Sequence, residues 1–166
     1  MSPTQRDPWQ ELGEALSGNF TARARGLLAS DFALLDTEGK EIGCLEVHGT
    51  TGAKLRAGNA QARIERAERS GYNMLFRDMA ILTSTGNTTS PAIKYLNRPY
   101  ETALSLLRNK AEAGPPQHPT TIRIKGGLTN RTYRAIFDPH DEGSPPVALF
   151  LLYRLISLRR KAYVTG

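Results

Sequence analysis

The most constraining feature of the sequence is an apolar run near its end. Val147–Tyr153 carries only apolar side chains, and Leu155, Ile156 and Leu158 continue the run. A helix built from this run is apolar on every side, so there is no face that can be left in water. Such a helix must be surrounded by protein or lie in lipid.

The flanking residues predict where this helix begins and ends. Ser144 is followed by Pro145 and Pro146, a combination typical of an N-cap and a first helical turn. The run closes with the basic segment Arg159–Lys161. Cations near a helix C-terminus oppose the negative end of the helix dipole, so the sequence predicts a central helix at about residues 145–161.

The helix is too short and too polar to span a membrane. Val147–Leu158 is twelve residues long, or about 18 Å of helix, whereas crossing a bilayer core takes about 20 residues. Arg154 lies within the run and would cost about 2.5–3.5 kcal/mol at the bilayer centre. One helix on an open sheet would leave one side polar, so we expect a helix threaded through a closed β-barrel, with Arg154 near one mouth.

The preceding chain has the rhythm of short strands. Turn residues interrupt it roughly every eight to twelve positions. Two segments, Ala60–Arg69 and Tyr100–Leu107, also suit a helix, and Ala113–Pro119 is predicted to be a loop. The predicted strands are Phe20–Gly26, Phe32–Leu35, Ile42–Val47, Ala53–Ala57, Ala60–Arg69, Tyr72–Arg77, Met79–Thr83, Ala92–Leu96, Tyr100–Leu107, Thr121–Lys125 and Arg131–Asp138.

A short helix is predicted before the strands. Asp7 suits an N-cap, Pro8 the first helical position, and Gly18 the end of the helix. The fold class is therefore mainly β: a closed antiparallel β-barrel of about a dozen short strands around a central hydrophobic C-terminal helix, with a short N-terminal helix. We expect residues 1–19 to form the helix and lead-in, and residues 20–166 to form a single barrel domain.

The hairpin Phe32–Gly43, read as FALLDTEGKEIG, together with the all-apolar final helix, resembles the Tubby C-terminal-like superfamily, which includes the Tubby proteins and the phospholipid scramblases. The resemblance covers about residues 20–163. It implies a closed barrel of about a dozen antiparallel strands around a central helix, and binding to anionic lipid such as a phosphoinositide. The cations and the calcium-linked acidic segment of that family have no residue-by-residue match here, so the resemblance assigns no site.

The positive charge is concentrated in the last third of the chain. Residues 119–166 contain eight Lys or Arg and three Asp or Glu, so they hold five of the six net positive charges. Such an excess can bind an anionic lipid surface or an acidic protein, or can simply cover solvated strand faces. The candidate anionic-ligand residues are Arg123, Lys125, Arg131, Arg134, Arg159, Arg160 and Lys161.

The sequence gives no case for an enzyme, a metal site or a cofactor. Gly49–Lys54 lacks the spacing of a phosphate loop and predicts a tight turn. Asp138–Glu142 gathers three carboxylates and His140, but five adjacent residues rarely converge on one ion, so a solvated turn is favoured. Cys44 is the only cysteine, which excludes a disulfide, and is predicted to be a small buried side chain.

These observations leave three function classes open. The first is a non-enzymatic Tubby-like or scramblase-like module that binds an anionic membrane surface or an acidic partner. The second is a basic β protein that binds nucleic acid, which is disfavoured because Tyr133 and Phe137 alternate away from Arg134. The third is a structural protein with no specific ligand. No secretory signal precedes Leu16, so a cytoplasmic protein, peripheral to the membrane, is expected.

Overall fold

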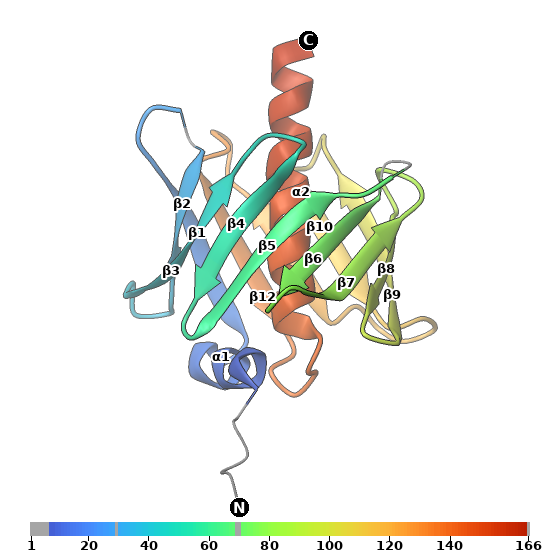
Figure 1. The fold of residues 1–166 in the computed structure, drawn as a ribbon. Coiled ribbons are helices and arrows are strands. Elements are labelled where there is room, and N and C mark those ends of the chain that lie inside the picture. Colours follow the sequence, from blue (N-terminus) through green and yellow to red (C-terminus); the bar gives the residue numbers. More distant parts are fainter. Residues whose placement is uncertain (1–6, 29, 69–70, 166) are drawn as a thin grey trace, which may run out of the picture.

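Twelve antiparallel strands form a closed barrel in the computed structural model of this chain (Figure 1). The structure describes residues 7–28, 30–68 and 71–165 and, within the last helix, side chains as far as residue 160. Each strand pairs with the next one in the chain, and β12 pairs with β1 to close the ring. The predicted mainly-β barrel with two helices is therefore confirmed.

The strands are short and follow one another in a simple meander. Their bounds are β1 (Asn19–Arg25), β2 (Asp31–Leu35), β3 (Glu41–Val47), β4 (Gly52–Ala57), β5 (Ala60–Arg66), β6 (Tyr72–Phe76), β7 (Met79–Thr85), β8 (Ala92–Tyr95), β9 (Arg98–Ser105), β10 (Lys110–Gly114), β11 (Ile122–Gly126) and β12 (Thr132–Phe137). The helices are α1 (Pro8–Leu16) and α2 (Ser144–Thr165).

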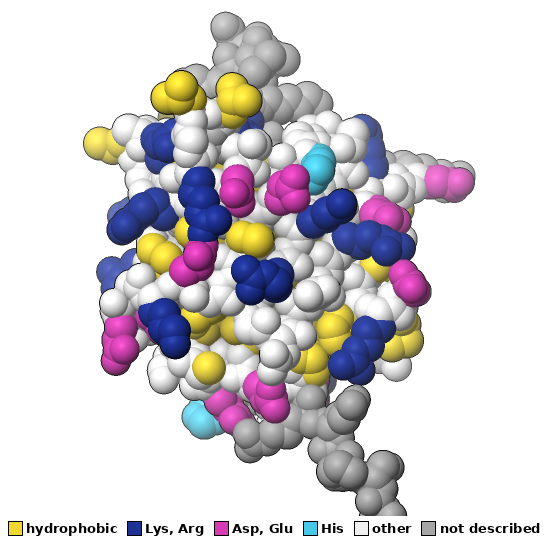
Figure 2. Space-filling view, turned by 60° about the vertical axis from the view of Figure 1, so that its left-hand side comes forward, with side chains coloured by type: hydrophobic (Ala, Val, Ile, Leu, Met, Phe, Trp, Pro, Cys, Tyr) yellow, Lys and Arg dark blue, Asp and Glu magenta, His cyan; other side chains and the backbone are white. Residues whose placement is uncertain are grey.

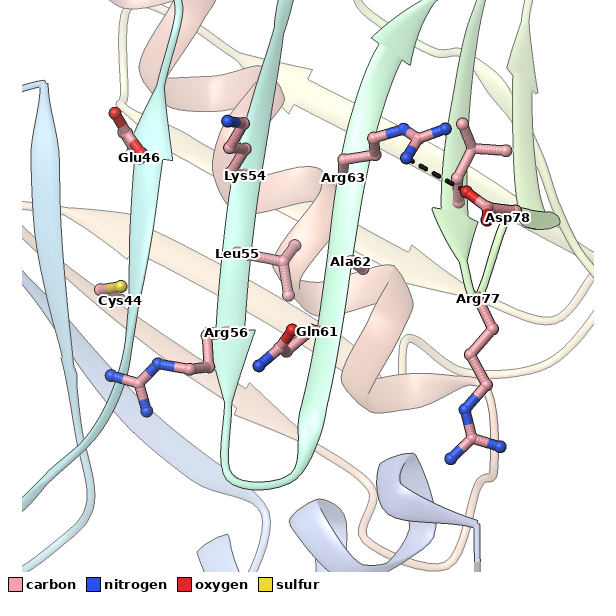
Figure 3. A pocket seen from close by; sticks show the side chains of 11 residues that line it. Cys44, Glu46, Lys54, Leu55, Arg56, Gln61, Ala62, Arg63, Arg77 and Asp78 are labelled. Atoms are coloured by element: carbon pink, nitrogen blue, oxygen red, sulfur yellow. Dashed lines mark hydrogen bonds and ion pairs between the residues drawn. The ribbon is translucent and has the colours of Figure 1, made fainter.

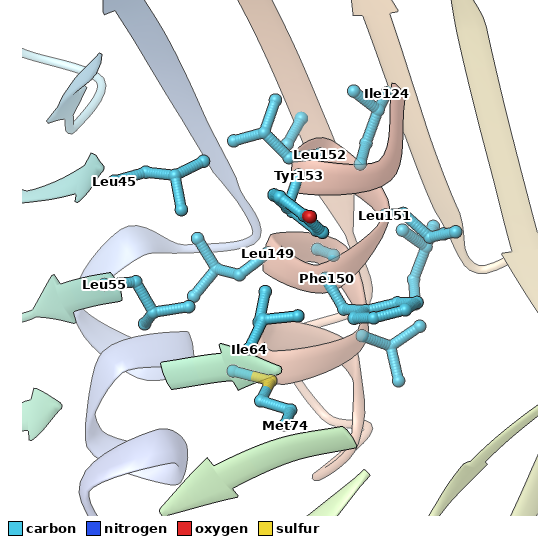
Figure 4. Close-up of a cluster of buried hydrophobic side chains, with 14 of the residues drawn as sticks. Leu45, Leu55, Ile64, Met74, Ile124, Leu149, Phe150, Leu151, Leu152 and Tyr153 are labelled. Atoms are coloured by element: carbon cyan, nitrogen blue, oxygen red, sulfur yellow. The ribbon is translucent and has the colours of Figure 1, made fainter. Parts of the chain in front are cut away.

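Helix α2 runs through the interior of the barrel (Figure 1). Every residue of Val147–Leu158 is buried, including Arg154 and Ser157. Inward-facing side chains from the strands, such as Leu45, Ile64 and Met74, surround the helix (Figure 4). The expectation that protein surrounds this run on all sides is confirmed, since no side of it faces water.

Strict alternation of side chains sorts the strand residues between the inside and the outside of the barrel. In β12, Tyr133, Ala135 and Phe137 are buried, whereas Arg134 and Ile136 are exposed, as predicted. In β11 the buried residues are Ile122 and Ile124, and the basic residues Arg123 and Lys125 are exposed. The inside of the barrel therefore collects apolar side chains, and the outside receives the charges.

The two mouths of the barrel differ. At the N-terminal mouth, where α2 begins, α1 packs across the opening and buries Trp9, Leu12 and Leu16 (Figure 1). The Asp7 side chain caps α1, because its carboxylate accepts a hydrogen bond from the Trp9 N–H at 3.0 Å. At the C-terminal mouth, where α2 leaves the barrel, the turns β1–β2, β3–β4, β5–β6, β7–β8, β9–β10 and β11–β12 form the rim.

Arg154 lies close to the C-terminal mouth, as predicted. Its guanidinium sits over the ring of Tyr72, the first residue of β6, at 4.2 Å from the ring centroid. Its Nη1 donates to the Ser157 hydroxyl at 3.3 Å. The neighbouring Tyr153 hydroxyl donates to the Gly49 carbonyl in the β3–β4 turn at 2.9 Å. A cation–π contact and a hydrogen bond thus partner the one charged side chain in the buried run.

Strand β10 is a correction to the sequence-based prediction. The predicted loop at Ala113–Pro119 is wrong at Ala113 and Gly114, which belong to β10 and pair with β9. The sequence of β10 is KAEAG, and all four residue types are depleted in strands. The strand forms because both neighbours pair with it and because Ala111 and Ala113 are small enough to face α2.

Cys44 is a second correction. It was predicted to be buried, but it is half-buried on the outer face of β3, where Gly43, Leu45 and Val47 point inward. The segment Ile42–Val47 carries apolar residues in both alternating sets, so the pattern does not say which set is inside. The pairing with β2 also contains a bulge, between Leu34 and Leu35.

The ends of α2 also differ from the prediction. The helix begins at Ser144 itself, whose hydroxyl donates to the Asp141 carboxylate at 3.0 Å. It does not stop at Lys161 but continues to Thr165. Ala60–Arg69 and Tyr100–Leu107, which also suited a helix, contain the strands β5 and β9.

We predict that the buried run of α2 dominates stability. Leu152→Ala, at a fully buried position, should lower the free energy of unfolding by about 2–5 kcal/mol, because it removes apolar burial and leaves a cavity. Leu107→Ala removes the same atoms at an exposed turn residue. It should change the free energy of unfolding by less than about 0.5 kcal/mol. Urea unfolding followed by circular dichroism measures both, and equal losses in the two variants would contradict this account.

Candidate functional site

A hollow of about 520 Å³ lies on the outer face of β10, β11 and β12. We call it the basic groove. It brings together three of the residues that the sequence analysis singled out, Arg123, Lys125 and Arg134. Its lining comprises Lys110, Ala111, Glu112, Arg123, Ile124, Lys125, Gly126, Gly127, Thr132, Arg134 and Ile136.

The strand register fixes the spacing of the cations. Lys110 on β10 pairs with Lys125 on β11, and Lys125 pairs with Arg134 on β12. Adjacent strands lie about 4.8 Å apart, so three positive charges stand in one row across the sheet. Arg123 lies two residues from Lys125 on the same face. Like charges directly opposite each other are destabilising, so the row is a place where a bound anion would relieve repulsion.

Little negative charge offsets this row. Glu112 lies 3.9 Å from Lys110 and stands opposite Arg123 in the register of β10 and β11. It is the only acidic residue among the described residues that line the groove. Among the described residues, no hydrogen bond or ion pair holds the side chains of Arg123, Lys125 or Arg134. The groove thus combines four cations with one carboxylate, and three of the cations are available to a ligand.

The groove also offers apolar contact. Ile136, on β12 opposite Arg123, is 54% exposed. Gly127, just after the end of β11, has no side chain, and a Cβ there would have only the Thr132 carbonyl oxygen within 4 Å. The surface can therefore take a ligand that is anionic but not uniformly polar.

Three of the remaining sequence candidates, Arg131, Arg159 and Arg160, bind backbone carbonyls at the C-terminal mouth. Arg131 Nη2 donates to the Gly26 carbonyl at 2.8 Å. Arg159 donates to the Leu106 carbonyl and, at 3.1 Å, to Asn130 Oδ1, and Arg160 donates to the Leu28 carbonyl. The side chain of Lys161 lies outside the described residues. The seven predicted residues therefore do not form one cluster.

Lys110 is a groove residue that the sequence analysis missed. It enters the site only because β10 pairs with β11 and sets it opposite Lys125. The segment 110–114 was not predicted as a strand, so no sequence signal placed Lys110 beside the other cations.

A second hollow, of about 360 Å³, lies on the outer face of β3–β6 and has a different charge balance (Figure 3). Arg63 donates to Glu65 at 2.7 Å and to Asp78 at 3.2 Å. Figure 2 shows Lys and Arg interspersed with Asp and Glu over the face that it presents. Paired charges of this kind have less to gain from an anion than the row in the basic groove.

The acidic segment Asp138–Glu142 has a structural role at the N-terminal mouth. The Asp141 carboxylate accepts hydrogen bonds from the Tyr100 hydroxyl at 2.8 and 2.9 Å, from Ser144 Oγ, and from the Gly143 N–H at 3.2 Å. Within the described part of the chain, no three His, Cys, Asp or Glu side chains are grouped so as to hold a metal ion. Asp141 instead ties β9 to the start of α2.

The tight turn predicted at Gly49–Lys54 is confirmed at its start. The Thr51 N–H donates to the His48 carbonyl at 3.2 Å, and the His48 N–H donates to the Gly52 carbonyl at 2.9 Å. Gly49 has a φ of 60° and Gly52 one of 154°, values that favour glycine. From Gly52 on, the segment forms β4.

Comparison with protein-family models, with curated proteins and with solved structures finds no match to this chain. Among the helices described, none combines the length and the apolar character needed to cross a bilayer.

We predict that the hydrogen bond between Tyr100 and Asp141 makes the free energy of unfolding fall at alkaline pH. Burial, and then the hydrogen bond to Asp141, raise the pKa of Tyr100 above its usual value of 10.0. A group with a raised pKa in the folded state stabilises the fold fully below the unfolded pKa, and its contribution is lost as the pH rises through the folded pKa. The stability that Tyr100 provides should therefore decline above about pH 10.

The test compares Tyr100→Phe with the unaltered chain. At pH 7 the variant should be about 1.5–3 kcal/mol less stable, because a hydrogen bond to a charged group is lost. Urea unfolding at a series of pH values should show this difference narrowing above about pH 10. If the difference in stability between the variant and the unaltered chain stays constant above this pH, the ionisation of Tyr100 does not contribute to the pH dependence of stability.

Proposed function

We propose that this protein is a non-enzymatic binding module that recognises an anionic membrane surface by holding lipid headgroup phosphates in the basic groove. The observation that carries the proposal is the set Arg123, Lys125 and Arg134, which border one hollow without a hydrogen-bond or ion-pair partner among the described residues.

The groove has the chemistry that a phosphate group requires. Guanidinium groups donate paired, charge-assisted hydrogen bonds to phosphate oxygens, and an ammonium group adds a compact charge. The volume of about 520 Å³ lies within the range of small-ligand sites, about 300–1,000 Å³. Ile136 gives the glycerol or acyl part of a lipid an apolar contact. A lipid headgroup therefore suits the groove better than a simple inorganic ion.

Kinship with the Tubby C-terminal-like superfamily is part of this proposal. The closed barrel of twelve antiparallel strands and the buried C-terminal helix support it, because both are what the resemblance implies. On this view the protein is cytoplasmic and peripheral to the membrane.

Nucleic acid is a poorer ligand for the same cations. Binding to single strands depends on aromatic side chains on which bases stack. Tyr133 and Phe137, the aromatic residues of β12, are buried inside the barrel. No aromatic side chain that the structure describes is exposed. An acidic protein is the alternative partner for the same cations, and the vesicle experiment below separates it from lipid.

We predict that neutralising three of the four groove cations strongly weakens binding to anionic vesicles. In a flotation assay the protein should bind vesicles of phosphatidylcholine mixed with phosphatidylserine or phosphoinositide, and bind phosphatidylcholine alone far less. A basic residue near an anionic surface contributes about 1 kcal/mol, so the combined change Arg123→Gln, Lys125→Gln and Arg134→Gln should weaken binding by about 3 kcal/mol, or roughly 100-fold.

The control removes the same net charge elsewhere. Lys54→Gln, Arg56→Gln and Lys94→Gln change exposed residues on β4 and β8 and should weaken binding much less. Equal losses in both triple variants would show that net charge, and not the groove, attracts the membrane. No binding to any anionic vesicle would refute the lipid assignment and leave an acidic protein as the partner to test.

A further inference from the structure

Four leucines at the C-terminal mouth are almost fully exposed. Leu27 and Leu28 in the β1–β2 turn are 100% and 82% exposed, Leu107 in the β9–β10 turn is 94% exposed, and Leu128 in the β11–β12 turn is 97% exposed. Among the described residues, the other exposed large apolar side chains reach no more than 60%. Figure 2 shows hydrophobic side chains protruding from the upper end of the molecule, the end at which α2 leaves the barrel in Figure 1.

The leucine-bearing turns are neighbours on one sector of the rim. β10 pairs with β11, β11 with β12, and β12 with β1. The turns β9–β10, β11–β12 and β1–β2 therefore follow one another around the mouth. The basic groove opens on the same strands and extends to Gly127, the residue before Leu128. The exposed leucines and the groove cations thus belong to one continuous surface.

Hydrogen bonds connect described residues of these turns to other parts of the rim. Arg131 and Arg160 donate to the Gly26 and Leu28 carbonyls of the β1–β2 turn. The Asn109 side chain donates to the Gly127 carbonyl at 3.1 Å and to Asn130 Oδ1 at 3.0 Å, which joins the β9–β10 turn to the β11–β12 turn.

The charges of the three turns match an anionic surface. Residues 26–30, 106–109 and 127–131 contain Arg108 and Arg131 and no Asp or Glu. Arg159 and Arg160 of α2 add two more cations at the same mouth. A bilayer presents phosphates above an apolar layer, and apolar side chains that enter this layer place nearby arginines at the depth of the phosphates.

The arrangement favours a bilayer over a protein partner. The core of a protein interface is a close-packed apolar patch, whereas these leucines stand on three separate turns, with Gly26, Gly127 and Asn130 beside them. A lipid interface accepts each apolar tip independently, because the acyl region adapts to whatever enters it.

We propose that the C-terminal mouth rests on the membrane, with Leu27, Leu28, Leu107 and Leu128 inserted into the interfacial layer while the basic groove holds a headgroup beside them. This inference rests on the proposed function for the class of ligand. It adds the orientation of the barrel: the rim sector formed by the β9–β10, β11–β12 and β1–β2 turns faces the bilayer, and α1 at the other mouth faces away from it.

The insertion can be measured with a fluorophore at a single cysteine. In a Cys44→Ser background, which removes the only natural cysteine, Leu128→Cys and Met79→Cys each carry an environment-sensitive dye. Met79 begins β7 at the opposite mouth and is 60% exposed. With phosphatidylcholine–phosphatidylserine vesicles, the dye at residue 128 should shift to the blue and be quenched by spin labels on the acyl chains, and the dye at residue 79 should do neither.

A second set of variants tests the contribution of the leucines to binding. Leu27→Ser, Leu28→Ser, Leu107→Ser and Leu128→Ser combined should lower the vesicle partition coefficient at least about tenfold, because apolar area no longer leaves water. Met79→Ser with Leu96→Ser, at the other mouth, should change it less than about twofold. The thermal unfolding midpoint of each variant reports whether the barrel is intact.

The outcomes separate the two proposals. Binding that depends on the groove cations, with no blue shift at residue 128, would overturn the insertion and leave the groove assignment standing. A blue shift at residue 128 that persists unchanged with Arg123→Gln, Lys125→Gln and Arg134→Gln would overturn the groove assignment and leave the insertion standing. Failure to bind either neutral or anionic vesicles would overturn both.

Discussion

The burial of α2 is the constraint on which the rest of the structure depends. An α-helix with its side chains is about 10–12 Å across, and the interior of an eight-stranded barrel is filled by its own side chains. A barrel that encloses a helix needs more strands, and this one has twelve. It also needs small inward-facing residues, and many buried strand positions are alanine: Ala22, Ala53, Ala57, Ala60, Ala111, Ala113 and Ala135.

The same constraint produces the outer surface. Because the strand positions that face the interior carry mostly apolar side chains, the charged residues of the strands lie on the outside of the barrel. Antiparallel pairing then fixes which of these residues are neighbours, as it does for Lys110, Lys125 and Arg134. The basic groove thus has two causes. The burial of α2 places the charged residues of the strands outside, and the register of β10, β11 and β12 brings together the arginines and lysines in which the last third of the chain is rich.

Much of the architecture can be predicted from the sequence, because its decisive signals are local. The apolar run Val147–Leu158 requires an enclosure, and the alternation in β11 and β12 identifies the inward faces correctly. The failures have a common physical origin. β10 consists of residue types that are depleted in strands, and pairing with its two neighbours holds it in place. The side of the sheet on which Cys44 lies likewise depends on how β3 pairs with its neighbours.

The site is harder to predict than the fold for the same reason. The charge excess of the last third was visible, but the separation of Arg123, Lys125 and Arg134 from Arg131 and Arg159 depends on strand register and on turn geometry. Leu107 was included in a predicted strand, whereas the structure places it at the tip of a turn. Apolar residues at turn tips resemble core residues in sequence, and only the closed barrel shows that nothing covers them.

The axial position of α2 connects the interior to the rim. At the N-terminal mouth, Asp141 ties the start of the helix to Tyr100. Near the other mouth, Arg154 is only 6% exposed, and its charge is tolerated because it lies against Tyr72 at the end of the barrel. Sliding the helix by one turn, about 5.4 Å, would either draw this charge into the apolar interior or pull apolar residues out of it. The position that satisfies Arg154 also sets Arg159 and Arg160 against the carbonyls of the rim turns. The single charge within the buried run therefore sets the position of the cations that border the exposed leucines.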